Sequence, residues 1–160
     1  MCKKNLFCFL LFFNVFFVSC SKDLSNDELA LYIKYAGLNP QEVKVLANSK
    51  EILKNEIKFG QQLTIELNGI DDFEVDKFNF VHPGGENSVV DEDNNVIYFV
   101  EDYFNKYGDK GVSPENAEAL KFNLTIGKPM IPGKSYHFLF KIWDKLNKKE
   151  LKGNMEIKVI

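Results

Sequence analysis

The sequence predicts a mainly β fold, an antiparallel β-sandwich of about seven or eight strands with one or two short helices. Apolar and polar residues alternate with a period of two in several segments after residue 43, which puts one face of each strand on a core. Turn-forming Gly, Pro, Asn and Asp residues separate these segments. A chain of 160 residues is typical of one compact domain.

The first 19 residues are expected to lie outside this domain. Lys3 and Lys4 precede an apolar run from Leu6 to Val18 that carries no charge. A basic start followed by an apolar run of this length is typical of a secretory signal peptide. The run is shorter than the roughly 20 residues that a spanning helix needs, so an uncleaved anchor is the less favoured interpretation. We therefore predict a signal peptide over residues 1–19.

A cysteine follows the apolar run, after Phe17, Val18 and the small residue Ser19. This ending resembles the lipobox of bacterial lipoproteins, and the Phe-rich run without arginine is similar to lipoproteins of Bacteroidota. The resemblance implies that Cys20 is lipidated and that residues 20–26 form the lipidated cysteine and a tether. It also implies a cell-envelope protein attached to the outer membrane by its lipid, facing either the periplasm or the surface. A secretory signal with a chance cysteine is the alternative.

Residues 27–160 are expected to form a single domain, whose first segment is ambiguous. The run Ser25-Asn26-Asp27-Glu28 has the spacing of a helix capping box, whereas Tyr32 and its neighbours also suit a strand, so residues 25–37 could be either. Strands are predicted over residues 63–67, 78–80, 97–100, 122–126, 136–142 and 155–159. Turns are predicted over residues 68–69, 83–85, 93–95, 132–133 and 153–154.

Two short helices are predicted in the longest connection. Residues 101–108 are expected to make one or two helical turns that Gly108 closes. Ser113, Pro114 and Glu115 supply an N-cap, a proline at the first helical position and an early acid, which predicts a helix to about Leu120. A connection of this length is unusual in a sandwich, and long connections are either functional or decorative.

The order of elements from residue 120 to the end resembles the last three strands of immunoglobulin-like domains. Tyr136 follows a corner at Pro132 and Gly133, where that family places a tyrosine. The resemblance implies that the tyrosine hydroxyl bonds to the backbone a few residues upstream. It also implies a disulfide-free relative, because Cys2 and Cys8 lie in the signal peptide.

Composition and motifs exclude several classes of function. The formal charge of −3 and the sequence pI near 5.5 give no basic surface for nucleic acid. The sequence contains no Gly-x-Ser-x-Gly nucleophile elbow, no zinc-binding helix motif and no phosphate loop. We therefore predict a protein that is not an enzyme and that needs no cofactor.

Binding of a protein or glycan partner is the leading hypothesis for function. Tyr98, Tyr103, Tyr107 and Trp143 lie off the predicted core face, and exposed aromatic residues are favoured at contact surfaces. His82 precedes a Pro-Gly-Gly sequence and is the histidine better placed to touch a ligand. The same aromatic residues also suit packing over the second face of a sheet, and the sequence favours that interpretation of these side chains.

Two further hypotheses stay open. One is a periplasmic inhibitor or immunity-type lipoprotein that neutralises a toxin or an enzyme. The other is a calcium-stabilised structural module, with Asp91 and Asp93 as candidate ligands, because calcium takes six to eight oxygen ligands. The same residues also suit a hairpin turn, where Asp and Asn tolerate unusual backbone angles, and the sequence favours that interpretation.

Overall fold

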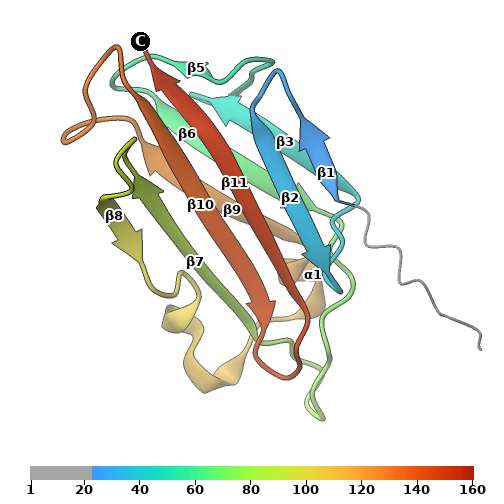
Figure 1. Cartoon of the computed structure of the whole chain (residues 1–160). Helices are drawn as coiled ribbons and strands as arrows, with labels where there is room; N and C mark the ends of the chain where they lie inside the picture. Colours follow the sequence, from blue (N-terminus) through green and yellow to red (C-terminus); the bar gives the residue numbers. More distant parts are fainter. Residues whose placement is uncertain (1–22) are drawn as a thin grey trace, which may run out of the picture.

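The computed structural model describes residues 23–160, so the predicted signal peptide and Cys20 lie outside the described residues. The fold is mainly β, as predicted, and its long strands pair antiparallel in two sheets. Figure 1 shows these sheets as two stacked layers, with the short helices at one end. The described part of the chain holds eight strands of at least five residues, which agrees with the predicted number.

The larger sheet has the strand order β1-β2-β11-β10-β7-β8, and β5 pairs in parallel with β11. Its strands are β1 (Leu24–Asn26), β2 (Leu31–Ala36), β5 (Glu56–Ile57), β7 (Pro83–Val90), β8 (Val96–Val100), β10 (Ser135–Asp144) and β11 (Glu150–Val159). The smaller sheet has the order β4-β3-β6-β9. Its strands are β3 (Glu42–Ala47), β4 (Lys50–Glu51), β6 (Gln62–Asn68) and β9 (Ala119–Thr125).

One hydrophobic core lies between the two sheets. The inward residues of β10 are buried and alternate with half-buried residues on the outer face, as the period of two requires. Phe122 of the smaller sheet packs against Phe140 of the larger one, with ring centroids 5.2 Å apart. Phe140 in turn contacts Phe138, at 5.9 Å. The two sheets therefore bury their apolar faces against each other.

The ambiguous N-terminal segment forms strands. β1 and β2 pair across a turn in which the Leu29 N–H donates to Asn26 Oδ1 at 3.0 Å. Asn26, the residue after the serine that suggested a capping box, thus closes a turn, and Ala30 takes a left-handed conformation with φ of 47°. The domain begins earlier than predicted, because residues 24–26 of the expected tether pair with β2.

The predicted strand over residues 78–80 is wrong, because these residues form a turn around Asp76. The N–H groups of Phe78 and Phe80 donate to Asp76 Oδ1, at 2.8 and 2.9 Å. Asn79 is left-handed, with φ of 64°, and the two phenylalanines are exposed. An aspartate that accepts from its own following backbone competes with strand formation.

Two predicted turns lie inside strands instead. Residues 83–85 belong to β7 and residues 153–154 belong to β11. Glycine stands there because a ring lies against the backbone: Trp143 covers Gly84, and Phe140 covers Gly153. Glycine in a strand marks a close approach as well as a turn.

The long connection contains two helices, both shorter or later than predicted. A 3₁₀ helix, η1 (Asn105–Lys110), ends at Gly111 with φ of 70°, so Gly108 does not close it. The helix α1 (Pro114–Ala117) begins at the predicted proline but ends before Leu120. Leu120 is buried in β9, and its burial in the core sets the end of the helix.

Candidate functional site

Tyr103, a predicted contact residue, is a packing residue. Its ring meets Phe122 edge-on, at 5.5 Å between centroids. Its hydroxyl accepts from Asn87 Nδ2 at 3.0 Å and donates to the Asn123 carbonyl at 3.1 Å. Burial, followed by the nearby Tyr98 hydroxyl, raises the pKa of Tyr103 to about 12. This tyrosine therefore links the two sheets.

The other two predicted tyrosines lie apart from each other. Tyr107 is 40% exposed and stacks on Phe104, which packs over Gly85 of β7. Tyr98 is 38% exposed and lines a hollow of about 280 Å³ between β8 and β9. The structure therefore does not bring the predicted tyrosines into one contact surface.

His82 is held in the fold by Asp76. Its Nε2 lies 3.0 Å from Asp76 Oδ2, and its side chain is 13% exposed. The hydrogen bond from His82, followed by that from the Phe80 N–H, lowers the pKa of Asp76. The same carboxylate closes the turn described above, so His82 supports a loop.

Trp143 lies on the outer face of the larger sheet, where the sequence alternation predicts it. The indole rests against Gly84, and Lys141 Nζ lies 5.2 Å from the ring centroid. The tryptophan is half-buried by these contacts.

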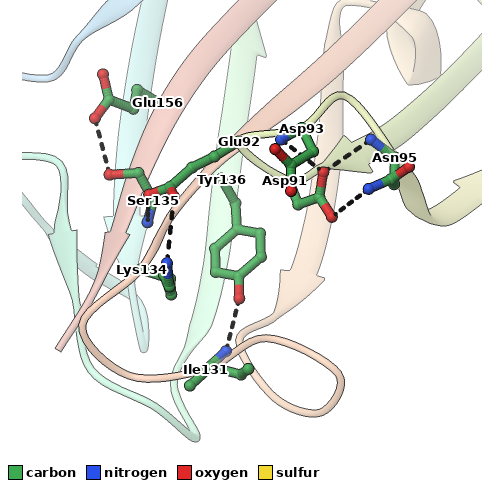
Figure 2. Close-up of polar contacts among 9 residues, drawn as sticks. All are labelled: Asp91, Glu92, Asp93, Asn95, Ile131, Lys134, Ser135, Tyr136 and Glu156. Atoms are coloured by element: carbon green, nitrogen blue, oxygen red, sulfur yellow. Dashed lines mark hydrogen bonds and ion pairs between the residues drawn. The ribbon is translucent and has the colours of Figure 1, made fainter.

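Figure 2 shows the predicted tyrosine corner beside the loop of the calcium candidates. The Ile131 N–H donates to the Tyr136 hydroxyl at 2.8 Å, which confirms the backbone bond that the resemblance implied. Asp91 accepts from the backbone N–H groups of Asp93 and Asn95, at 3.0 and 2.8 Å, and from the Asn95 side chain. These bonds build the hairpin turn between β7 and β8.

The turn therefore occupies the oxygens of Asp91. Glu92, beside it, reaches across to the corner, where it accepts from the Ser135 N–H and pairs with Lys134 (Figure 2). Among residues 23–160, no three His, Cys, Asp or Glu side chains gather as a metal ion would require. Asp91 therefore closes a turn, and Glu92 links this turn to the loop at Lys134.

An open groove of about 410 Å³ crosses the outer face of the larger sheet. Its two ends are aromatic: Tyr32 on β2 is 47% exposed, and Phe99 on β8 is 57% exposed. Leu139 of β10 lies in its floor. Two exposed aromatic side chains with an apolar residue between them are the strongest candidate binding surface on the described chain.

The residues of this groove lie in rows that cross the strands, and in each row neighbouring residues are cross-strand partners. One row runs across five strands, through Tyr32, Asn154, Leu139, Ser88 and Phe99. Four steps of about 4.8 Å between strands separate its ends, a span of roughly 19 Å. A second row runs beside it, through Lys34, Lys152, Lys141 and Glu86. The floor is thus apolar and amide-bearing, and one side is lined by lysines.

Glu150 organises the lysine side of the groove. Its carboxylate pairs with Lys152 at 2.7 Å and with Lys141 at 3.1 Å. Hydrogen bonding by Lys152, and then by Lys141, lowers the pKa of Glu150 against the opposing effect of its burial. The two ammonium groups are therefore held in place beside the groove, and Lys34 lies at its outer end.

The sequence analysis missed Tyr32, Phe99 and Leu139 as site residues. A signal was present for Leu139, an apolar residue between lysine and histidine on the outward face of β10. No local signal joins Tyr32 to Phe99, because they meet across one groove only through the order of five strands. The site is therefore a product of tertiary structure.

Comparisons with known proteins give no family for this chain. No protein-family model and no curated protein sequence matches it. Among solved structures, a superoxide reductase (neelaredoxin) from Ignicoccus hospitalis matches this chain distantly, with 14% identity and a TM-score of 0.39. The match covers 76% of this chain and 82% of that chain. Within the described range, no helix combines the length and the apolar character needed to cross a bilayer.

Proposed function

We propose that this chain is a lipid-anchored cell-envelope protein without enzymatic activity, and that its domain binds a glycan in the groove between Tyr32 and Phe99. The observation that carries the proposal is the groove itself, a surface of aromatic ends, apolar floor and fixed lysines on a rigid sheet. A rigid scaffold positions contact groups with little loss of conformational entropy on binding.

The chemistry of the groove favours a glycan over a protein segment. The floor is the face of interior strands, whose backbone groups already pair with neighbouring strands. An extended peptide would therefore find few backbone partners there. A glycan supplies its own hydroxyl groups for Lys34, Asn154 and Ser88, and its apolar faces can lie on the two aromatic ends.

The attachment to the outer membrane rests on the sequence of the first 20 residues. Each buried methylene of an acyl chain contributes about 0.8 kcal/mol, so a multiply acylated Cys20 would hold the domain on the bilayer essentially permanently. Metabolic labelling with a clickable fatty acid tests this proposal. Cys20→Ala is expected to abolish the label and to leave unprocessed precursor, and a label that survives the change would contradict the anchor.

We further infer an immunoglobulin-like topology for the domain. The sheet pairings β6 with β9, β7 with β10 and β10 with β11 match the pairings B–E, C–F and F–G of such domains. The hydroxyl of Tyr136 at the corner before the penultimate strand supports the same inference. Topology of this kind is shared by many unrelated functions, so the glycan proposal rests on the groove alone.

Binding of the full chain, purified in detergent, to a glycan array tests the groove. Tyr32→Ala and Phe99→Ala are each expected to weaken binding of the retained glycans by about tenfold, because each removes one of the two aromatic contacts of the groove. Tyr107→Ala is the control, because it removes a 40% exposed aromatic side chain that does not line the groove. Retention of no glycan, or an equal loss in the control, would contradict the proposal.

A further inference from the structure

β8 is an edge strand, and its pairing with β7 shifts register once, between Val89 and Val90. It ends the strand order of the larger sheet, and within residues 23–160 no other strand pairs with its free edge. Its sequence, Val-Ile-Tyr-Phe-Val, contains no charge and no proline. Val96, Tyr98 and Phe99 are 62%, 38% and 57% exposed. Natural proteins usually guard such an edge with lysine, proline or a very short strand.

The other sheet edges of the described chain are guarded in these ways. β1 is three residues long, and β4 consists of Lys50 and Glu51. β9 carries Lys121, which pairs with Glu66 at 2.6 Å, and its Asn123 carbonyl accepts from Tyr103. Among the edges of the described chain, β8 is therefore longer than β1 and β4, and unlike β4 and β9 it carries no lysine, so it offers backbone groups to which a further strand could pair.

Acidic side chains stand at both ends of β8. Asp91, Glu92 and Asp93 precede it, and Glu101 and Asp102 follow it. Lys134 pairs with Glu92 and Lys145 with Asp102, and Asp91 closes its own turn. Among the described residues, Asp93 and Glu101 have no ion-pair partner within reach.

A hollow at the end of β8 adds to this charge pattern. Its volume is about 600 Å³, and it is lined by Glu86, Val100, Glu101, Asp102, Asn105 and Trp143. Asp102 already pairs with Lys145 and the indole with Lys141, so Glu86 and Glu101 are the groups of this hollow that suit a further lysine or arginine side chain.

The charges argue against a second copy of this chain as the occupant. In an antiparallel pairing of two copies centred on Tyr98, Glu101 of one copy lies opposite Asn95 of the other. Glu101 is then a diagonal neighbour of Asp93, which lies two residues before Asn95. A parallel pairing places Asp93 beside Asp93. Like charges across a strand pair are destabilising.

We propose that β8 binds an extended protein segment by strand addition, and that this segment carries alternating apolar residues with a lysine or arginine at each end. The backbone of the segment pairs with the free edge of β8. Its inward apolar side chains enter the 280 Å³ hollow beside Tyr98, and its terminal cations meet Asp93 and Glu101. This inference does not depend on the glycan groove.

The test adds an eight-residue peptide to the full chain in detergent. The peptide has a lysine at each end, and Val alternates with Thr at the six positions between them. Hydrogen exchange is measured across the chain. At saturating peptide, the amides of β8 are expected to exchange at least tenfold more slowly, whereas those of β1 and β4 are unchanged. Failure to protect β8 at millimolar peptide, or protection elsewhere only, would overturn the proposal.

Charge reversal distinguishes this partner from other occupants. Glu101→Lys is expected to weaken peptide binding about two- to fivefold, the range for an exposed ion pair. Glu51→Lys makes the same change of charge on β4 and is expected to leave binding unaltered. A peptide with glutamate ends should bind more weakly than the lysine form. Equal binding of the two peptides, or a peptide-sensitive dimer formed through β8, would contradict the stated chemistry.

Tyr32→Ala separates this inference from the proposed function. It removes the far end of the groove, so it should reduce glycan binding and leave peptide binding unchanged. Loss of both activities in Tyr32→Ala would contradict a separate edge site. Loss of glycan binding alone, with β8 protection intact, supports it.

Discussion

Gly153 is a position where one methyl group should disturb the core. A Cβ placed on Gly153 would lie 1.9 Å from Cζ of Phe140 and within 2.4 Å of both Cε atoms. The ring would have to withdraw by about 1.5 Å to restore ordinary contact, and close packing leaves little room for that. Phe122 and Phe138 hold it from two sides, with centroids at 5.2 and 5.9 Å.

We expect Gly153→Ala to lower the free energy of unfolding by about 3 kcal/mol, the upper part of the range for overpacked cores. For a domain of this size each kcal/mol corresponds to roughly 3–5 °C, so the melting temperature should fall by about 10 °C. Thermal unfolding followed by circular dichroism measures this. Gly127→Ala is the matched control, because nothing lies within 4 Å of a Cβ at that position.

A double mutant tests the reasoning further. Phe140→Leu removes most of the ring that the new methyl group meets, so the two changes together should cost less than the sum of their separate effects, by about 1–2 kcal/mol. Gly153→Ala would refute the predicted overlap if it melted within 2 °C of the unchanged protein. Strict additivity of the two substitutions would refute it as well.

Three further predictions concern single side chains. Tyr136→Phe leaves a backbone N–H at the corner without its acceptor, and chemical denaturation should show a loss of about 1–2 kcal/mol. Gly84→Ala places a methyl group 2.1 Å from the indole of Trp143, the single tryptophan, so its fluorescence should shift to the red while the melting temperature changes little. The pKa of Asp76 is lowered by its bond from His82, so its stabilising effect is present above the ordinary value of 3.8 and is lost as the pH falls below it. The difference in melting temperature between the unchanged protein and Asp76→Asn should therefore be constant at neutral pH and vanish in acid; a difference that grew below pH 3.8 would contradict the sign.

Local pattern was enough to predict the fold class and several details. Alternation in β6, β9, β10 and β11 predicted which side chains enter the core, because one face of each strand contacts the core and the other contacts water. The corner tyrosine was predicted with its bond, since the turn and the next strand are adjacent in the chain. The hairpin turn that Asp91 closes was predicted for the same reason.

Errors arose where a local signal had a non-local cause. The glycines in β7 and β11 were predicted to lie in turns, but each lies in a strand with an aromatic ring over it: Trp143 over Gly84, Phe104 over Gly85 and Phe140 over Gly153. The alternation at Phe78 and Phe80 predicted a strand. Their backbone N–H groups instead donate to the Asp76 carboxylate, which holds the segment in a turn. For the aromatic residues of the long connection the sequence left packing and partner contact open, and Tyr103 packs between the sheets.

The sequence by itself determined that this protein is a sandwich of antiparallel strands, because a period of two assigns each residue to a core face or an outer face. It could not determine which outer faces become neighbours. Tyr32 and Phe99 form one groove because three strands, β11, β10 and β7, lie between β2 and β8 in the sheet. The free edge of β8 was decided in the same way, since an edge exists only once the order of all strands is set.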